Sequence, residues 1–160
     1  MKRILFYIML GLPSLGLASD LIEKKSDITL ELATNLATET LSQCHNEGKF
    51  GVVSIVDRGG NLVLVMRDNN VGPHNTIASQ RKAYTALSTK VETRTLMKKA
   101  QMDTESSNLN TINELLLLGG GVPIKYNSET IGAIGVAGMG GSEFDEKCAV
   151  QAIKKIFKGI

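Results

Sequence analysis

The 160-residue sequence has no tryptophan, three tyrosines, three prolines, two histidines and two cysteines. Proteins that bind nucleic acid usually carry a basic stripe with interleaved aromatic residues. No basic cluster here is larger than Lys154-Lys155. We therefore do not expect a nucleic-acid partner.

The scarcity of histidine and cysteine also argues against a metal site built from side chains alone. No CxxC or HExxH spacing occurs in the chain. Cys44 and His45 are adjacent, and neighbouring side chains diverge on a helix. A zinc site would therefore need Cys148 and a distant fourth side chain as well, because structural zinc ions are usually bound by four ligands.

Catalytic motifs are equally scarce. No G-x-S-x-G nucleophile elbow is present. The glycine-rich stretch 138–141 resembles a phosphate-binding loop, but no lysine follows it as a Walker-type site requires. Its helix would begin with acidic residues that repel phosphate, namely Glu143, Asp145 and Glu146. Asp57 and Asp68 end predicted strands, a position typical of turn formers.

The N-terminal residues have the pattern of a signal peptide, which we place at residues 1–18. Lys2-Arg3 precede the apolar run 4–12, and Gly16-Leu17-Ala18 forms a cleavage site of small residues. That run is shorter than the roughly 20 residues of a membrane-spanning helix. An uncleaved anchor is the alternative interpretation. The pattern predicts a periplasmic or secreted protein.

Cleavage would leave residues 19–160, which is 160 − 18 = 142 residues and the size of one domain. The chain has 18 basic and 16 acidic residues, and Lys2 and Arg3 leave with the signal, so the mature domain would carry 18 − 2 = 16 of each sign. No second apolar run is long enough to span a membrane. We therefore expect no membrane association after cleavage.

Export would place Cys44 and Cys148 in an oxidising compartment. They fall near the end of the first predicted helix and the start of the last, so antiparallel packing of these helices would bring the thiols together. We consider a Cys44–Cys148 disulfide and two buried free cysteines as the two alternatives.

Hydrophobic periodicity predicts four helices and two hairpins. The helices are expected at residues 28–46, 76–89, 93–102 and 142–157, and the strands at 51–57, 61–67, 122–126 and 130–137. We expect Ser26 or Asp27 to cap the first helix, and Ser142 with Asp145 to form a capping box at the last. In the second helix, Ile77, Tyr84 and Leu87 would lie on one side together with Val91. Residues 103–113 would be surface loop, with one helical turn as the alternative. The order indicates a single α+β domain with an antiparallel sheet covered by helices.

Several ordered motifs resemble the GlcG/HbpS-type haem-binding family over most of the mature chain. They are Val56-Asp57-Arg58-Gly59-Gly60-Asn61-Leu62, Met66-Arg67-Asp68, Gly72-Pro73-His74, Arg81-Lys82-Ala83-Tyr84-Thr85-Ala86, Gly119-Gly120-Gly121-Val122-Pro123-Ile124, Ile131-Gly132-Ala133-Ile134-Gly135-Val136 and Asp145-Glu146-Lys147-Cys148-Ala149. The resemblance implies haem binding, and in some members haem degradation or redox sensing, often in homo-oligomers. Related sequences often have Asp-Gly-Ala where this chain has Asp68-Asn69-Asn70, at the expected pocket rim.

With that resemblance, the leading hypothesis is an exported binding protein for haem or a related tetrapyrrole. His74 is the candidate axial iron ligand. Arg67 and Arg81 are candidate partners of the propionates, and Lys82 is a further cofactor-binding candidate. The alternatives are an enzyme that acts on haem or on a small organic acid, and an oligomeric interaction module without a small-molecule ligand.

Overall fold

The protein is described by a computed structural model that covers residues 22–158. The proposed signal peptide, residues 1–18, lies outside the described residues. The elements follow in the order α1 (Leu30–His45), β1 (Val52–Asp57), β2 (Leu62–Arg67), α2 (His74–Thr89), α3 (Thr93–Met102), α4 (Thr104–Ser107), η2 (Asn108–Thr111), β3 (Gly121–Tyr126), β4 (Glu129–Ala137) and α5 (Ser142–Phe157). None of the helices between residues 22 and 158 is long and apolar enough to cross a membrane.

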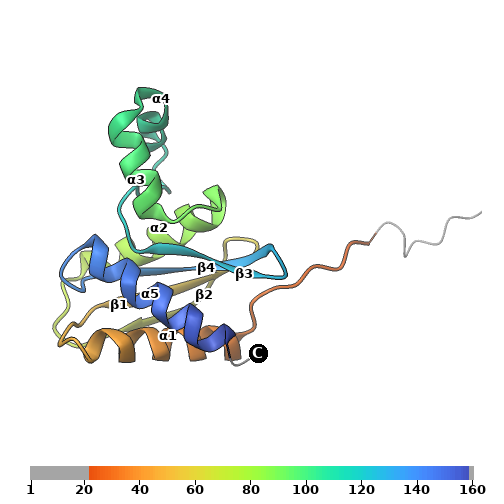
Figure 1. The fold of residues 1–160 in the computed structure, drawn as a ribbon, viewed down its shortest axis with the longest axis vertical. Coiled ribbons are helices and arrows are strands. Elements are labelled where there is room, and N and C mark those ends of the chain that lie inside the picture. Colours follow the sequence, from red (N-terminus) through yellow and green to blue (C-terminus); the bar gives the residue numbers. More distant parts are fainter. Residues whose placement is uncertain (1–21, 159–160) are drawn as a thin grey trace, which may run out of the picture.

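Four antiparallel strands form the central sheet in the order β2-β1-β4-β3. The two predicted hairpins are therefore confirmed, and β1 and β4 join them at the centre. Helices α1 and α5 pack side by side on one face, and α2 covers the other (Figure 1). The prediction of an α+β domain with a helix-covered antiparallel sheet is confirmed.

The main core lies between the sheet and the helices α1 and α5. Helix α1 buries a stripe at helical spacing (Ala33, Leu36, Ala37, Leu41 and Cys44), which packs on Val53, Ile55 and the strands beside them. The cap of this helix differs from the prediction. Thr29 is the N-cap, and its side chain accepts a hydrogen bond from the Leu32 N–H at 3.1 Å. Asp27 instead accepts hydrogen bonds from Ile28 and Arg58.

The buried face of α2 is made of small and polar residues and does not include its large apolar residues Ile77 and Tyr84. It consists of Ser79, Lys82, Ala83, Thr85 and Ala86, whereas Ile77 is 63% exposed and Tyr84 38%. The reason is the glycine-rich surface of the sheet. A Cβ atom on Gly135 would lie 1.9 Å from the Ser79 carbonyl oxygen, so the helix backbone approaches the sheet too closely for large side chains. Ile77 and Tyr84, which the sequence placed on one side of the helix, therefore stay largely exposed.

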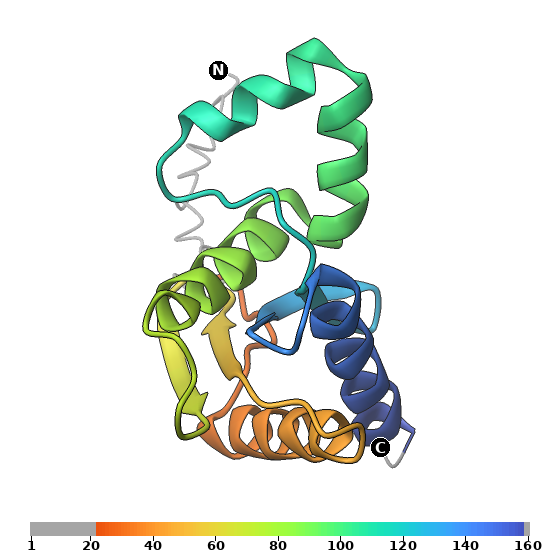
Figure 2. The same ribbon diagram turned by 90° about the vertical axis from the view of Figure 1, so that its left-hand side faces the viewer.

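Residues 93–118 form an arm that projects away from the sheet (Figure 2). The part predicted as surface loop with one helical turn as the alternative forms the short helix α4 and the 3-10 helix η2. Leu96, Leu115 and Leu117 make a small separate core in the arm. Thr93 anchors its base, because its hydroxyl donates to the Leu118 carbonyl and accepts from the Gly121 N–H, both at 2.8 Å.

Candidate functional site

A cleft of about 540 Å³ opens at the end of the sheet where β1 begins and β2 and β4 end. The β2–α2 loop forms most of its wall, and the starts of β1 and of the β4–α5 loop complete it. The lining residues are Phe50, Asp68, Asn69, Asn70, Val71, Gly72, Asn75 and Gly138. The volume lies within the range usual for small-molecule sites.

His74 is the first residue of α2 and lies in the chain between Gly72 and Asn75, two residues of the cleft lining, without itself belonging to the lining. Its imidazole lies against Gly72, since a Cβ atom on Gly72 would stand 3.0 Å from His74 Cε1 and 3.2 Å from Nδ1. The side chain is exposed. Among residues 22–158 no hydrogen bond or ion pair engages its ring, whereas Nε2 of His45 is bonded to Asp68. Of the two histidines, His74 therefore has the imidazole available to a ligand.

Arg67 and Asn75 fix the loop that forms the cleft wall. Nη2 of Arg67 donates to the Val71 carbonyl at 2.6 Å, which closes the loop back onto the end of β2. Both the backbone N–H and the side-chain amide of Asn75 donate to the Gly72 carbonyl, at 3.0 and 3.2 Å. The structure thus brings two predicted site residues, His74 and Arg67, to the same loop.

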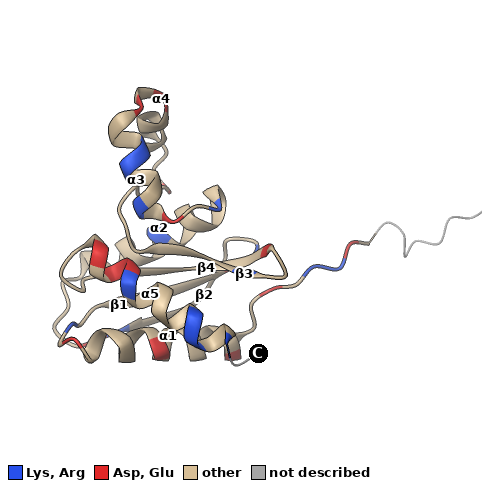
Figure 3. Ribbon diagram, viewed as in Figure 1, with Lys and Arg blue, Asp and Glu red and all other residues tan. Residues whose placement is uncertain are grey.

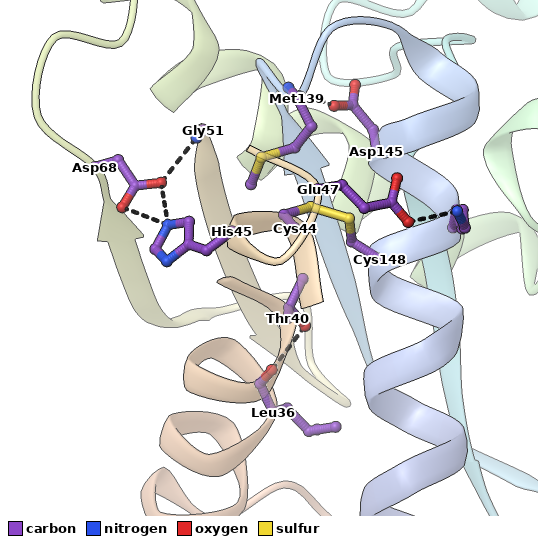
Figure 4. Close-up of a disulfide and its surroundings, with 11 residues drawn as sticks. Leu36, Thr40, Cys44, His45, Glu47, Gly51, Asp68, Met139, Asp145 and Cys148 are labelled. Carbon is purple, nitrogen blue, oxygen red and sulfur yellow. Dashed lines mark hydrogen bonds and ion pairs between the residues drawn. A yellow bond between two sulfur atoms is a disulfide. The ribbon is translucent and has the colours of Figure 1, made fainter. Parts of the chain in front are cut away.

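Asp68 connects the cleft to α1. Its carboxylate accepts a hydrogen bond from the Gly51 N–H at 2.9 Å and contacts His45 Nε2 at 3.0 Å (Figure 4). The His45 ring also lies 5.1 Å from the Phe50 ring, measured between centroids. One carboxylate therefore holds the end of α1 and the start of β1 against the cleft wall. The strand-end position of Asp68 gave no signal for this role in the sequence.

The structure joins Cys44 to Cys148 by a disulfide, with the two Cα atoms 5.6 Å apart. Cys44 immediately precedes His45, and the bond ties this end of α1 to α5 (Figure 4). Both residues are buried. The disulfide is the first of the two alternatives that the sequence left open.

Lys82 lies in the interior, and not on a ligand-facing surface. Its Nζ donates to Asp145 Oδ2 at 2.8 Å and to the Val136 carbonyl at 2.9 Å, with side-chain exposures of 2% for Lys82 and 4% for Asp145. Burial raises the pKa of the Asp145 carboxyl above its ordinary value, although the Lys82 ammonium and a hydrogen bond from the Met139 N–H oppose the rise.

The predicted capping box of Ser142 and Asp145 at the start of α5 was wrong, because the Asp145 carboxylate is bonded to Lys82 instead. Gly141 is the N-cap of α5 and makes no side-chain cap hydrogen bond, and Ser142 is the first helical residue. The Asp145 carboxylate points inward to Lys82 and to the backbone of Met139, which lies beside Gly138 of the cleft lining. The buried pair thus supports the wall opposite Asp68.

Arg81 lies apart from the cleft. Its Nη2 donates to the Leu115 carbonyl at 2.6 Å, and its side chain lines a separate shallow groove with Leu62 and Tyr84. The four predicted cofactor contacts therefore divide into His74 and Arg67 at the cleft, Arg81 at the groove and Lys82 in the core. Phe50 and Asn75 line the cleft without having been predicted, because no motif distinguishes them. No group of three or more His, Cys, Asp or Glu residues within 22–158 could hold a metal ion.

Comparison with known proteins places this architecture in a class associated with haem. The family model described as "Haem degrading protein HbpS-like" matches residues 28–154, and the chain therefore belongs to this family. It is 31% identical over 113 residues to an uncharacterized 15.0 kDa protein in the dhaT-dhaS intergenic region of Citrobacter freundii, covering 69% of this chain and 80% of that protein.

Solved structures agree with the family assignment. A double mutant of HbpS from Streptomyces reticuli superposes with a TM-score of 0.79 at 29% identity, over 91% of this chain and 97% of the other. A PduOC:heme complex gives a TM-score of 0.73 at 23% identity, over 80% and 94% of the two chains, which shows a shared fold. Membership of the family supports a haem-related function and confirms the resemblance seen in the sequence motifs.

Proposed function

We propose that this chain is an exported haem-binding protein, and that haem occupies the cleft beside His74 with its iron bound by the His74 imidazole. The observation that carries this proposal is the position of His74. Its ring lies against Gly72, a residue of the cleft lining, and no hydrogen bond or ion pair from another described residue engages it. Neutral imidazole is a common axial ligand of haem iron.

The lining of the cleft fits a partly exposed haem. Phe50 and Val71 offer apolar contacts to a porphyrin face. Three amide side chains, from Asn69, Asn70 and Asn75, can donate hydrogen bonds to propionate oxygens. The Asp68-Asn69-Asn70 segment, which departs from the common family pattern, supplies two of them.

Arg67 is the cation best placed to bind a propionate. Its bond to the Val71 carbonyl uses one of the five N–H donors of a guanidinium. The side chain is exposed, and it is bonded to Val71 and adjacent to Asp68, both lining residues of the cleft. Arg81 lines a different groove and Lys82 is buried, and their hydrogen bonds to Leu115 and Asp145 give them structural roles. We therefore keep Arg67 and give up Arg81 and Lys82 as ligand contacts in this proposal.

Export is the second part of the proposal. It rests on the signal-like pattern of residues 1–18 and on the Cys44–Cys148 disulfide, a bond that persists in oxidising compartments. Assembly into homo-oligomers is proposed from the resemblance. A role in redox sensing stays a prediction.

A haem-degrading enzyme is the second candidate, because the family to which the chain belongs is described as haem-degrading. A single experiment on the haem-loaded protein distinguishes haem binding from haem degradation. Addition of a reductant in air leaves the Soret band of a simple binding protein in place. A degrading enzyme instead loses the band in parallel with the release of iron that a chelator detects.

The test of binding is a titration of residues 19–160 with ferric haem. We expect a saturable Soret shift at a stoichiometric ratio, and a weaker affinity in His74→Ala. His45→Gln is the matched control, because glutamine can still donate to Asp68 but lacks an imidazole. A titration unchanged by His74→Ala would remove this residue from the site.

A further inference from the structure

A second pocket, of about 290 Å³, lies at the other end of β1 from the cleft beside His74. Phe50 of the cleft lining precedes β1, whereas Arg58 of this pocket follows it. The residues that line the second pocket are Arg58, Gly59, Gly60, Tyr84, Leu87, Ser88, Lys90 and Thr130. No residue belongs to both linings, and the smaller volume suits a ligand much smaller than haem.

The turn between β1 and β2 holds one wall of this pocket in a fixed position. Gly60 has a φ of +85°, and a Cβ atom there would lie 3.1 Å from the Tyr84 ring, so glycine lets the turn pack on α2. The Gly60 N–H donates to the Asp57 carbonyl at 3.1 Å, and the Arg58 N–H donates to Asp27 Oδ1 at 2.9 Å. The wall is therefore formed before any ligand arrives.

The Arg58 guanidinium is anchored through Nη1. This nitrogen donates to the Ser26 carbonyl at 3.2 Å and to Glu129 Oε2 at 3.1 Å. The Glu129 carboxylate is shared with Lys25, whose Nζ lies 3.8 Å from Oε1. Nε and Nη2 of Arg58 make no hydrogen bond with any residue between 22 and 158, and the side chain is 30% exposed. Such an edge is suited to bind two oxygens of a carboxylate or phosphate group.

Lys90 stands beside the pocket in an unusual backbone conformation. It is the C-cap of α2, with φ 57° and ψ 21° in the left-handed region. Helices that end with a left-handed residue mostly use glycine there, and sometimes asparagine. A function of the side chain would account for lysine at such a position.

The Lys90 ammonium is also available to a ligand. Charged residues of this protein lie mostly on the helices and turns (Figure 3). Several of them are paired, as Lys147 is with Glu47 and Lys155 with Glu39. Lys90 makes no ion pair or side-chain hydrogen bond with any residue between 22 and 158.

The charges of the pocket favour an anion. Among the described residues that line it, Arg58 and Lys90 are cations and none is acidic. Ser88 and Thr130 line it as well, and their hydroxyls can donate hydrogen bonds to an oxyanion. The C-terminal end of α2 opposes an anion, but a helix dipole is equivalent to only about half a charge. Two full positive charges therefore outweigh it.

We propose that this pocket binds a small dianion, whose carboxylate or phosphate oxygens are held by the Nε–Nη2 edge of Arg58 and by the Lys90 ammonium. Tyr84 and Leu87 offer apolar contacts to the carbon atoms between or beside the charged groups. Neither His74 nor haem takes part, so the site does not rest on the proposed haem function.

The first test is isothermal titration calorimetry of residues 19–160 with succinate and with inorganic phosphate. We expect saturable binding at a stoichiometric ratio. Acetate should bind about tenfold more weakly or worse, because it carries one charge and can satisfy only one of the two cations. Tighter binding of phosphate would identify a phosphorylated ligand, and tighter binding of succinate a dicarboxylate. Saturation by neither dianion, or acetate that binds as tightly as the better dianion, would overturn the proposal.

A substitution of Lys90 tests its role without a change of backbone. Lys90→Asn removes the charge, and asparagine tolerates the left-handed region. It should weaken binding of the better dianion about tenfold while the melting temperature is kept. Lys158→Asn is the matched control, because Lys158 is the C-cap of α5 and lines a different groove. Equal affinities in the two variants would contradict the proposal.

Nuclear magnetic resonance locates the bound anion. The amide signals of Gly59, Gly60 and Thr130 should shift when the better dianion is added to wild type. Shifts confined to other segments would overturn the assignment of this pocket. Lys90→Asn should bind ferric haem as wild type does, so a failure of the anion site can be told apart from a failure of the haem site.

Discussion

Lys82 and Asp145 form an ion pair inside the fold, with Nζ and Oδ2 2.8 Å apart, and so connect the middle of α2 to the first turn of α5. Loss of one partner leaves an uncompensated charge in the interior. We expect Lys82→Met to lower the free energy of unfolding by roughly 3–5 kcal/mol, measured by urea denaturation.

The double variant Lys82→Met/Asp145→Leu should regain much of this loss, because it removes both charges together. Lys147→Met is the control, since it breaks the solvent-exposed pair with Glu47 and should cost about 1 kcal/mol or less. Equal losses in Lys82→Met and Lys147→Met would contradict the structural role of the buried pair.

The Cys44–Cys148 disulfide closes a loop with a sequence separation of 104 residues. The double variant Cys44→Ser/Cys148→Ser should lose about 3–5 kcal/mol of unfolding free energy, because a long cross-linked loop restricts the unfolded chain. Thiol titration of the denatured, unreduced mature protein gives the direct check. We expect no free thiol, and two per chain would rule the bond out.

Asp68 should affect ligand binding through the cleft wall and not by contact with iron. Asp68→Ala removes the acceptor of the Gly51 N–H and the partner of His45. The loss of two such bonds, at about 1 kcal/mol for each bond, should weaken the ferric haem affinity by up to roughly thirtyfold. Asp103→Ala is the control, because Asp103 also accepts backbone hydrogen bonds but lies on the arm. Equal haem affinities in the two variants would argue against this role.

Glu39 provides a pH test of the contact between α1 and α5. Hydrogen bonds from Lys155 and Gln43 lower the pKa of the Glu39 carboxyl below its ordinary value of 4.5. A group with a lowered pKa in the folded state stabilises the fold above its ordinary pKa and loses that contribution as the pH falls through the lowered value. The difference in unfolding free energy between wild type and Glu39→Gln should therefore shrink below about pH 4.5. A difference that stays constant with pH would contradict the assignment.

Much of the fold could be predicted from the sequence because its signals are local. Alternating and continuous apolar runs marked the strands, and Arg58-Gly59-Gly60 marked the first turn. The buried face of α2 could not be predicted in this way. Apolar spacing favoured Ile77 and Tyr84, whereas the close approach of Gly135 to the Ser79 backbone decides which side chains fit.

In the candidate site, too, local motifs could be predicted from the sequence, whereas contacts between distant segments could not. The motif Gly72-Pro73-His74 located the loop that borders the cleft. Helical spacing then suggested that Arg81 faces the same ligand, but the structure turns this residue toward Leu115. The role of Asp145 depends on Lys82, 63 residues away along the chain, and no local pattern carries such information.

The central claim is that the His74 imidazole binds haem iron in the cleft. Low-temperature electron paramagnetic resonance of the ferric haem complex tests it most directly. The account predicts a signal typical of imidazole ligation in wild type and in His45→Gln, its loss in His74→Ala, and its return when free imidazole is added to that variant. An identical signal in wild type and His74→Ala would contradict the account.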